Sequence, residues 1–326
     1  MPDTLDRAPL TPGSTGLTGV VACVLTYNRA AILLRCLAAI RAQSHPVDRI
    51  VIFDNGSTDG TETTIAAAGL LDDARVTFVR ADRNLGPAAG LHALMRRAYD
   101  DGADWLWVMD DDVLPAPDAL AELALAFNAA IGDPGALGFL VSRVVTPDGR
   151  PNNVPDIDNR QDHAAPPRWT DLLHHGLVRV AWATFNSVLF PRSALREFGF
   201  PLPAFFYGGE DIDLTIRIAR ARPSYIVGRS LAVHLRDSSG TFHPAKETDR
   251  GRIPLYFYYY RNQVYLRRAH MSRKALALFL FGVLRDMLRV AKDGRHRWAM
   301  LRVMATGAAA GMLFAPRREG STGGEA

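Results

Sequence analysis

The sequence predicts an α/β protein built on an open, doubly wound sheet whose strands are mostly parallel. Four short apolar stretches rich in β-branched residues alternate with segments of helical periodicity in the first 110 residues. Such alternation is typical of β-α-β units, which place parallel strands side by side with helices on both faces. In sheets of this kind, ligands bind beyond the carboxyl ends of the strands.

Four strands and the helices between them account for this first part of the chain. The first strand reads "VVACVLT", a continuous apolar run expected of a strand that is buried on both faces. Apolar side chains then recur at helical spacing at Leu33, Leu34, Leu37 and Ile40. The turns "DNGSTDGT" and "RNLGPAAG" each open a further helix. The four predicted strands cover residues 20–26, 50–53, 75–79 and 105–109.

The rest of the chain predicts a second half and a helical tail. Residues 146–169 are polar and rich in proline, which indicates a surface loop or a boundary between two halves. Residues 261–314 show a mostly helical pattern. Between these segments we predict paired strands within 177–190, a short helix over 191–200, a helix over 211–221 and a strand over 225–235.

Composition and charge indicate an ordinary globular protein with one basic end. The chain has 326 residues, 48% of them hydrophobic, and a formal net charge of +4. Between Arg261 and Arg302, eleven Lys or Arg residues face two acids. The two cysteines, Cys23 and Cys36, lie in apolar or helical segments and predict buried thiols in a reducing compartment. The first residues carry no apolar stretch, so we expect a cytoplasmic protein without a signal peptide.

Three consecutive carboxylates, Asp110, Asp111 and Asp112, follow the fourth strand directly. Adjacent carboxylates repel one another unless a cation compensates them, and Mg²⁺ or Mn²⁺ prefers such oxygen ligands. Alternate side chains of an extended segment point the same way, so Asp110 and Asp112 can share one ion while Asp111 points elsewhere. A solvated acidic turn is the alternative. Placement at the end of a buried strand favours the metal site.

Polar residues also end the other predicted strands. Thr26, Asp54, Asp110 and the turn 81–86 lie at four strand ends that share one crevice of a doubly wound sheet. This combination predicts a nucleotide site, although Asp-Asn-Gly alone is a common turn formula. The sequence lacks the glycine-rich fingerprints of ATP-hydrolysing and dinucleotide-binding proteins, which disfavours both of those classes.

A second acidic cluster begins the helix predicted over 211–221. Gly208 and Gly209 permit a close backbone approach, and the helix dipole favours the negative charges of Glu210 and Asp211 at its start. Charge capping of the helix explains the pair equally well. The functional interpretation makes Asp211 a general base that removes a proton from an acceptor hydroxyl, while Asp213 faces another side of the helix and serves packing.

His234 follows an apolar strand and is a candidate metal ligand at the strand end, although a lone histidine is more often structural. Imidazole ligation would favour Mn²⁺ among the metals that prefer oxygen. The nearby residues Arg236, Ser238 and Ser239 either cover phosphate groups or form a polar loop.

The ordered segments of this chain resemble glycosyltransferase family 2, the inverting sugar transferases with the GT-A fold. The resemblance spans residues 18–270. It depends on the order of the whole set, because each piece alone is common. The segments are "VLTYNRAAILLRCLAAI", "DNGSTDGT", "RNLGPAAG", "WLWVMDDD", "FNSVLFPRSALREFGFP", "FFYGGEDIDLTIRI" and "FYYYRNQVYL".

The resemblance implies roles for individual residues. Asp110 and Asp112 match the family's Asp-x-Asp motif, which contacts the ribose and the divalent ion on the diphosphate. Asp211 matches the catalytic base, and His234 matches a metal ligand of the galactofuranosyltransferase branch. Gly208 and Gly209 follow Tyr207 where the family has a large residue before the acidic pair, so the packing of the acceptor differs here. The residues implied to contact the nucleotide-sugar are Thr26, Asp54, Arg83, Asn84, Asp110, Asp111 and Glu210.

The resemblance also implies a fold and a substrate class. It implies a Rossmann-like nucleotide-binding half with a mostly parallel sheet, plus a C-terminal helical appendage. We expect a UDP- or dTDP-sugar of galactofuranose or rhamnose type, Mn²⁺ or Mg²⁺, and a polyprenyl-linked or cell-wall glycan acceptor. Two alternatives remain: a silent sugar-nucleotide or glycan-binding protein, and a nucleotidyltransferase. The expected parts are a disordered lead (1–17), a donor-binding half (18–145), an acceptor-binding and catalytic half (146–260) and a basic tail (261–326).

The basic tail has two interpretations. Its apolar run "KALALFLFGVL" is too short to span a bilayer core, which requires about 20 residues. The surrounding arginines suit helices that lie on an anionic leaflet, at the inner face of the cell membrane. A helical cap on the catalytic part or a dimer contact is the alternative. Nucleic acid is disfavoured, because the charge lacks a recognised binding module.

Overall fold

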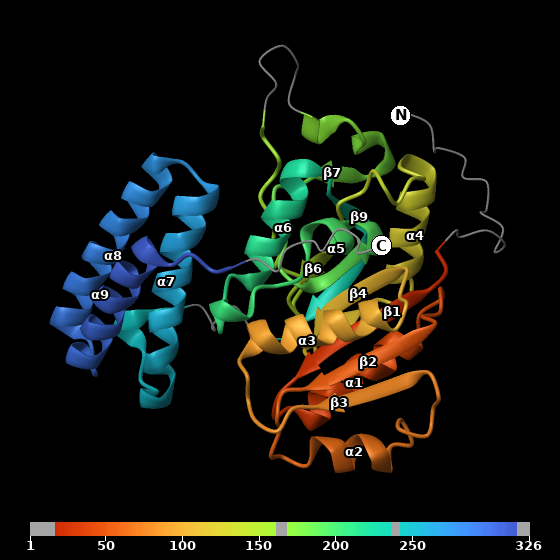
Figure 1. Cartoon of the computed structure of the whole chain (residues 1–326), viewed down its shortest axis with the longest axis horizontal. Coiled ribbons are helices and arrows are strands. Elements are labelled where there is room, and N and C mark those ends of the chain that lie inside the picture. The colour runs from red at the N-terminus through yellow and green to blue at the C-terminus, as the bar shows by residue number, and fades with distance from the viewer. Residues whose placement is uncertain (1–16, 161–167, 236–241, 318–326) are drawn as a thin grey trace, which may run out of the picture.

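The computed structural model describes residues 17–160, 168–235 and 242–317 (Figure 1). The predicted lead at 1–16, the loop residues Arg236, Ser238 and Ser239, and the last residues, 318–326, lie outside the described residues. Within them the chain forms a nine-stranded sheet of order β3-β2-β1-β4-β8-β6-β9-β5, in which β7 pairs with β9. The strands are β1 (Val20–Thr26), β2 (Arg49–Asp54), β3 (Val76–Arg80), β4 (Trp105–Asp110), β5 (Val113–Pro115), β6 (Leu140–Val145), β7 (Leu177–Arg179), β8 (Asn186–Pro191) and β9 (Tyr225–His234).

The first four strands run parallel, as the sequence predicts. β1 lies between β2 and β4, and β3 flanks β2. The register pairs Thr26 with Asp54 and Leu25 with Asp110, so the carboxyl ends of β1, β2 and β4 lie level. This alignment brings the polar residues that end these strands to one edge of the sheet.

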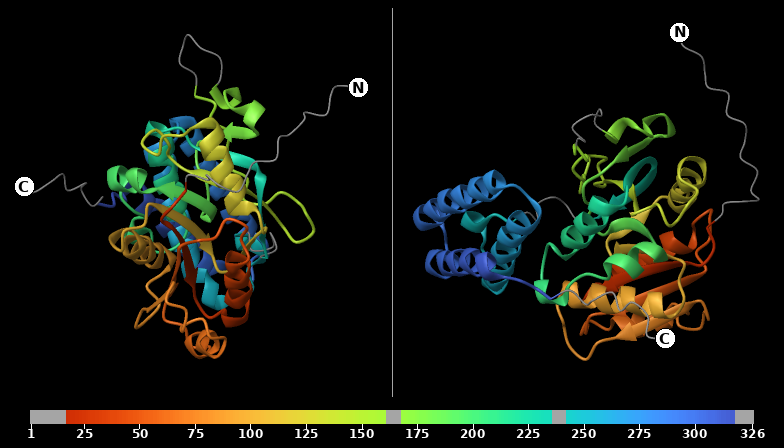
Figure 2. Two further views of the ribbon diagram at one scale, coloured as in Figure 1. Left: turned by 90° about the vertical axis from the view of Figure 1, so that its right-hand side faces the viewer. Right: turned by 45° about the horizontal axis from the view of Figure 1, so that its top comes forward.

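Helices cover both faces of the sheet. Along β1, Val20, Ala22 and Val24 face the core under α1 (Ala30–Arg41), α2 (Thr61–Ala67) and α4 (Ala119–Ala130). Their neighbours on β1 face the opposite core, under α3 (Pro87–Asp100), α5 (Arg192–Phe198) and α6 (Glu210–Ala221). Because successive side chains of a strand point to opposite faces, a fully apolar strand fits this three-layer arrangement (Figures 1 and 2).

The second half differs from the sequence prediction in its pairing. The strands within 177–190 exist as β7 and β8, but they do not pair with each other. β7 pairs with β9, and β8 lies antiparallel between β4 and β6. The sequence analysis also missed β5, β6 and α4. The chain therefore continues a single sheet through both predicted halves, and beyond β4 the pairing is mixed, since β8 is antiparallel to both of its neighbours while β6 and β9 are parallel.

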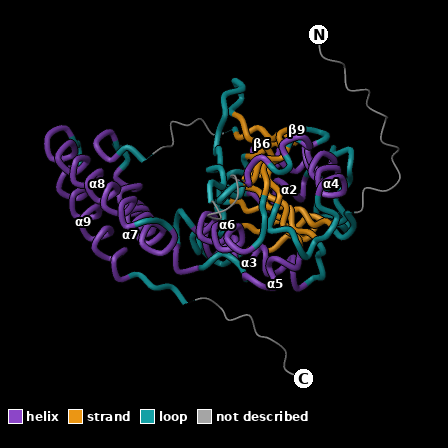
Figure 3. Tube along the Cα trace, turned by 90° about the horizontal axis from the view of Figure 1, so that it is seen from above, coloured by secondary structure: helices purple, strands orange, loops and turns teal. Residues whose placement is uncertain are grey.

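The helical appendage consists of α7 (Ile253–His270), α8 (Arg273–Asp293) and α9 (Arg297–Leu313). The predicted boundary between residues 260 and 261 falls inside α7, so the helical segment begins before it. Gly307 and Gly311 let α9 pack closely on α7, since a Cβ at either would lie 2.5 Å from a carbonyl oxygen of α7. α8 and α9 lie on the far side of α7 from the sheet (Figures 1 and 3). In the described ranges, every helix is too short or too polar to traverse a bilayer.

Candidate functional site

A pocket of about 370 Å³ opens at the carboxyl ends of the parallel strands. It combines residues from the ends of β1, β2 and β4 with the turn before α3, as predicted for a crevice shared by several strand ends. An aromatic loop before α6 and the first turn of α7 form the remaining wall. The lining residues are Leu25, Thr26, Tyr27, Arg29, Asn55, Asn84, Gly86, Pro87, Asp110, Asp111, Asp112, Phe206, Tyr207 and Leu255.

The three consecutive aspartates line this pocket, and two of them contact the hydroxyl of Thr26 or the guanidinium of Arg29. Asp111 accepts a hydrogen bond from Thr26 Oγ1 at 2.7 Å and another from Arg29 Nη1 at 3.1 Å. Arg29 Nη1 also donates to Asp112 Oδ2 at 2.7 Å. Asp111 therefore contacts the end of β1 and shares one guanidinium nitrogen with Asp112, and the prediction that it points away from a shared ion stays a prediction. The Arg29 guanidinium joins Asp111 and Asp112 from the loop between β1 and α1.

Burial and mutual repulsion act differently on the three carboxyl groups. Burial, followed by the charges of Asp112 and Asp111, raises the pKa of Asp110 well above its ordinary value. Burial also raises the pKa of Asp111, against the opposing effects of Thr26 and Arg29. For Asp112, burial is outweighed by His234 and Arg29, which together lower its pKa. The cluster thus holds more negative charge than its own cations compensate.

His234 ends β9 beside this cluster, as the strand pattern predicts. Its Nε2 atom lies 3.2 Å from Asp112 Oδ1, and its Nδ1 atom lies 3.3 Å from the side chains of Asn152 and Asn153. β5, which follows the aspartates directly, pairs with β9 and opposes Val113 to His234. The two asparagines fix the ring so that Nε2 faces the carboxylate, the arrangement that orients metal-ligating histidines.

The aspartate cluster has the donor chemistry of a divalent-cation site. Asp112 Oδ1 is buried and accepts no hydrogen bond within the described residues, and it lies beside an imidazole nitrogen. Over the same residues, no group of three or more His, Cys, Asp or Glu side chains is arranged to hold a metal. The chain therefore offers Asp112 and His234 together, with Asp110 in the same pocket. The predicted convergence of Asp110, Asp112 and His234 on one ion stays a prediction.

The second acidic cluster lies at the start of α6, on a loop held by α7. Gly208 and Gly209 both adopt positive φ angles of 77° and 95°, which bring the chain into the helix. Asn262 Nδ2 of α7 donates to the carbonyl oxygens of Phe205, Tyr207 and Gly208 at 2.8 to 3.0 Å. The amide side chain of α7 thus fixes the loop that presents Glu210 and Asp211.

Both acids of this pair are destabilised as anions. Burial raises the pKa of Asp211 to about 6, although backbone N–H groups at the helix start oppose this shift. Burial and the charge of Asp211 raise the pKa of Glu210 well above its ordinary value, and Glu210 Oε2 accepts no hydrogen bond in the described part of the chain. The charge of Asp211 also raises the pKa of Asp110, and the charge of Asp110 raises the pKa of Glu210. The two acidic clusters are therefore close enough to interact.

Asp213 has the structural role that the sequence predicts. It is fully buried, and its carboxylate forms ion pairs with Arg217 Nε at 2.9 Å and with His270 Nε2 at 2.8 Å. His270 is the last residue of α7, so this network joins α7 to α6. Together with Asn262, it ties the appendage to the helix that carries Asp211.

Some predicted contacts lie outside the pocket wall. Asp54 is buried, and its Oδ1 accepts a hydrogen bond from the backbone N–H of Ser57 at 3.0 Å, so its neighbour Asn55 lines the pocket instead. Asn84 lines the pocket, whereas Arg83 is exposed and Glu210 is not among the lining residues. Roles for Asp54, Arg83 and Glu210 in donor binding stay predictions.

The structure adds residues that the sequence analysis did not single out. Arg29 follows the tight turn "TYN", in which Asn28 adopts a positive φ of 53°. Phe206 also has a positive φ, of 60°, a conformation that is costly for an aromatic residue and often marks a functional loop. Its ring packs against Tyr258 of α7, with centroids 4.4 Å apart. The segment "TYNR" directly follows the first strand, so its position at a strand end could have marked Arg29 as a candidate site residue.

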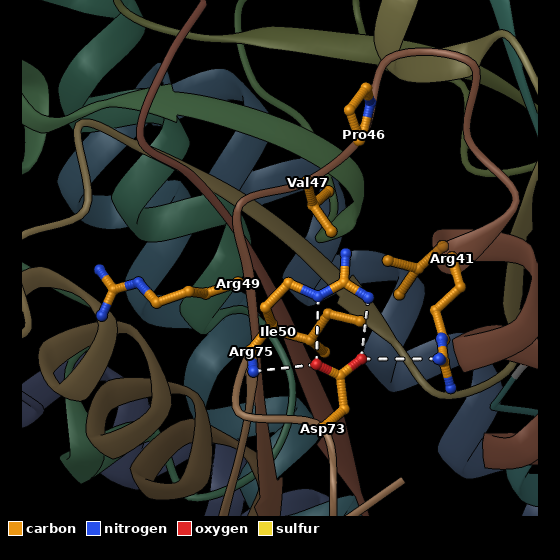
Figure 4. A pocket seen from close by; sticks show the side chains of 8 residues that line it. Arg41, Pro46, Val47, Arg49, Ile50, Asp73 and Arg75 are labelled. Carbon is orange, nitrogen blue, oxygen red and sulfur yellow. Dashed lines mark hydrogen bonds and ion pairs between the residues drawn. The ribbon is translucent and has the colours of Figure 1, made fainter.

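A second, much smaller pocket lies at the other end of the parallel strands. It measures about 30 Å³ and is lined by residues at the start of β2 and before β3 (Figure 4). Asp73 there pairs with Arg75 at 2.9 Å and with Arg41 at 3.5 Å. Hydrogen bonds from Arg75 lower the pKa of Asp73 to about 2. This pocket has room for little more than a water molecule, and its carboxylate is already compensated.

Comparison with known sequences identifies related proteins. The sequence model of "Glycosyl transferase family 2" matches residues 21–193. The galactofuranosyltransferase GlfT1 of Mycobacterium tuberculosis (strain CDC 1551 / Oshkosh) is 26% identical over 307 residues, covering 87% of this chain and 94% of the relative. The N-acetylglucosaminyl-diphospho-decaprenol L-rhamnosyltransferase of the same strain is 28% identical over 250 residues, covering 69% and 76%.

Comparison with solved structures shows the same fold. A mannosyltransferase from Pyrobaculum calidifontis, in complex with GDP-Man and Mn²⁺, superposes with a TM-score of 0.52 at 21% identity, covering 91% of this chain and 76% of that chain. GalNAc-T7 with UDP, GalNAc and Mn²⁺ superposes with a TM-score of 0.55 at 14% identity and covers 75% of this chain. The matched part spans about half of the GalNAc-T7 chain, 47%. These likenesses confirm the predicted α/β fold of GT-A type.

Proposed function

Because the chain belongs to glycosyltransferase family 2, we propose that it is an inverting, metal-dependent enzyme that transfers a single sugar from a UDP- or dTDP-sugar. The proposed sugar is of galactofuranose or rhamnose type, and the proposed acceptor is a hydroxyl of a lipid-linked or cell-wall glycan. Relatives named for galactofuranosyl and rhamnosyl transfer support this donor class. The observation that carries the proposal is the pocket in which three successive carboxylates end β4.

The donor nucleotide would bind along the carboxyl ends of β1, β2 and β4. Thr26, Asn55 and Asn84 offer hydrogen-bonding groups on one side of the pocket, where a base and ribose fit. Arg29 lines the same pocket with its side chain 37% exposed, so its remaining N–H groups can reach a diphosphate. A pocket of about 370 Å³ is within the usual range for a small-molecule ligand.

Asp112 and His234, with Asp110, would hold a divalent cation at this site. When bound, Mn²⁺ or Mg²⁺ neutralises charge on the diphosphate leaving group. Asp110 and Asp112 would supply oxygen ligands from the end of β4, and His234 would supply a nitrogen ligand from the end of β9. Asn152 and Asn153 orient the His234 ring. Two structural neighbours carry Mn²⁺ together with UDP or GDP-Man, which supports the proposal for this chain.

Asp211 would act as the general base. Its carboxylate accepts the proton of the acceptor hydroxyl while the acceptor oxygen bonds to the anomeric carbon and the bond from that carbon to the diphosphate oxygen breaks. The nucleoside diphosphate leaves on the opposite side, so the configuration inverts. A pKa of about 6 leaves Asp211 ionised at neutral pH and still basic enough to take the proton.

Phe206, Tyr207 and Leu255 form an apolar wall on one side of the pocket, where the acceptor would enter. The relative named for transfer to a decaprenol-linked sugar supports a lipid-linked acceptor. Such an acceptor would place the enzyme at the inner face of the cell membrane.

The direct test incubates the purified chain and Mn²⁺ with a panel of UDP-, dTDP- and GDP-sugars. We expect slow, selective hydrolysis and thermal stabilisation with one UDP- or dTDP-sugar, with release of the nucleoside diphosphate. A response to purine sugar nucleotides alone would overturn the donor assignment. Release of pyrophosphate from a nucleoside triphosphate would instead identify a nucleotidyltransferase.

A further inference from the structure

The outward face of α8 exposes a row of large apolar side chains. Leu278, Phe281, Leu284 and Leu288 are 62%, 67%, 56% and 66% exposed. Their spacing of three or four residues places them on one side of the helix. The opposite side of α8 contributes Val283 and Val290 to the core of the appendage. We name these four exposed side chains the α8 apolar row.

This row is unusual for the molecule. Eight of the thirteen large hydrophobic side chains exposed among the described residues lie between Met271 and Leu313, and the other five are scattered over the sheet domain. Scattered exposed apolar residues are normal on a protein surface, whereas a contiguous row marks a contact surface. Packing inside the appendage does not explain the row, because α8 keeps a separate buried side for that purpose.

Basic residues accompany the apolar row. Lys274, Arg285 and Lys292 are exposed and lie within about 60° of the centre of this face when α8 is drawn as a regular helix, and the exposed Arg289 lies at its border. Asp286 lies on another side of α8, next to the buried side, where it is half-buried and pairs with Arg289 at 3.1 Å and with Arg285 at 3.5 Å. From residue 273 to residue 302 there are eight Lys or Arg and two acids, so 8 − 2 gives a net charge of +6.

We propose that the α8 apolar row and its flanking cations dock on the anionic surface of a lipid bilayer. An amphipathic helix with large apolar residues on one face and basic residues beside them lies in the plane of the interface, with the apolar side chains among the acyl chains. α8 is not apolar enough to cross the bilayer, so the helix rests on one leaflet. α8 lies beyond α7 as seen from the sheet (Figures 1 and 3), and its buried side packs into the appendage through Val283 and Val290, so the α8 apolar row lies on the side away from that core.

Charge decides between a bilayer and a second copy of this chain. A symmetric dimer through this face would bring two clusters of like positive charge together, which opposes association. An anionic leaflet complements the same charge. The inference goes beyond the proposed function, because docking requires neither a particular donor sugar nor a particular acceptor.

The test measures binding of the full chain to vesicles of phosphatidylcholine with or without about one third phosphatidylglycerol. We expect the chain to sediment with the anionic vesicles, less so at high salt, and to sediment little with pure phosphatidylcholine.

The variant Leu278→Ser/Phe281→Ser/Leu288→Ser should bind the anionic vesicles at least about tenfold more weakly. Lys274→Gln or Lys292→Gln should each weaken it about fivefold. The matched control Val154→Ser/Leu173→Ser changes exposed apolar residues of the sheet domain, 59% and 49% exposed, and should bind as the unaltered chain does.

Two further measurements keep the result unambiguous. Sugar-nucleotide hydrolysis in solution should be the same for the triple variant and the unaltered chain, which shows that the variant folds and separates this inference from the proposed function. Light scattering should give the same mass for both. The proposal is overturned if the unaltered chain ignores anionic vesicles, if the triple variant binds them equally well, or if the row proves to hold a dimer together.

Discussion

Carboxylates at the two ends of the parallel strands have pKa values shifted in opposite directions. At the amino ends of the strands, Asp73 is enclosed by arginines, and its pKa falls to about 2 (Figure 4). At the carboxyl ends, Asp110 and Asp111 have raised pKa values, because burial and mutual repulsion outweigh their contacts with cations. The first carboxylate is compensated by the protein itself. At the other end His234 and Arg29 compensate Asp112, but Asp110 and Asp111 remain uncompensated, which is the property of a ligand site.

The largest effect should come from Asp211→Asn. Removal of the proposed base should lower kcat about a thousandfold or more, while the affinity for the nucleotide changes less than about threefold, because the amide keeps the size of the side chain. Sugar transfer and calorimetric nucleotide binding measure the two quantities. Retained turnover would exclude Asp211 as the base, and lost nucleotide binding would show that the substitution disturbs the pocket.

The next largest effect separates the two ends of the sheet. Asp112→Asn should weaken Mn²⁺-dependent binding of the nucleoside diphosphate about a hundredfold, because the proposed metal loses a charged ligand. Asp73→Asn, the matched substitution at the other end, should leave that binding unchanged. Equal effects of the two substitutions would remove the distinction between the two pockets.

The raised pKa of Asp211 predicts a dependence on pH. Activity should rise as pH rises through about 6, since only the ionised carboxylate accepts a proton.

The same shift predicts a pH dependence of stability. In the folded chain the pKa of Asp211 lies above the value of 3.8 for an unperturbed carboxyl group, so the stability contribution of Asp211 decreases between about pH 4 and pH 6. Asp211→Asn should therefore stabilise the fold by up to about 3 kcal/mol well above pH 6 and have little effect at pH 4. Denaturant unfolding at both pH values measures this difference, and equal gains at the two would contradict the assignment.

A smaller effect concerns Arg29, the guanidinium that contacts Asp111 and Asp112. Without nucleotide, Arg29 would compete with the proposed metal ion for Asp112, which it contacts at 2.7 Å. Arg29→Gln should therefore raise the affinity for Mn²⁺ alone by about tenfold, yet lower the affinity for the nucleoside diphosphate. Paramagnetic resonance of free Mn²⁺ measures the first quantity. Arg80→Gln is the control, since Arg80 lies 3.6 Å from Asp54 on a different strand. A loss of affinity for Mn²⁺ alone would show that Arg29 organises the carboxylates instead of competing for them.

The part of the fold that surrounds the donor pocket could be predicted from local sequence. β1, β2, β3 and β4 are short apolar runs followed by polar turns, and both signals lie within a few residues. The grouping of Thr26 and Asp110–Asp112 at one sheet edge follows from parallel strands alone.

Long-range pairing could not be read in the same way. β7 and β8 look like neighbours in sequence, yet each finds its partner elsewhere in the sheet. The aromatic run Tyr256–Tyr260 has strand propensity, but it forms part of α7 because Tyr256 and Tyr260 pack on α8 and α9. Arg29 escaped notice because a single arginine after a turn carries no periodic signal. Its role depends on carboxylates more than 80 residues away.

The central claim is that one divalent cation compensates both the carboxylates at the end of β4 and the diphosphate of the donor. Calorimetric titration of the nucleoside diphosphate into the unaltered chain, with Mn²⁺ and then with chelator, tests it most directly. We predict binding that depends on Mn²⁺ and is lost in Asp112→Asn. Binding of equal strength in chelator, or no binding of any nucleoside diphosphate with Mn²⁺ present, would contradict the account.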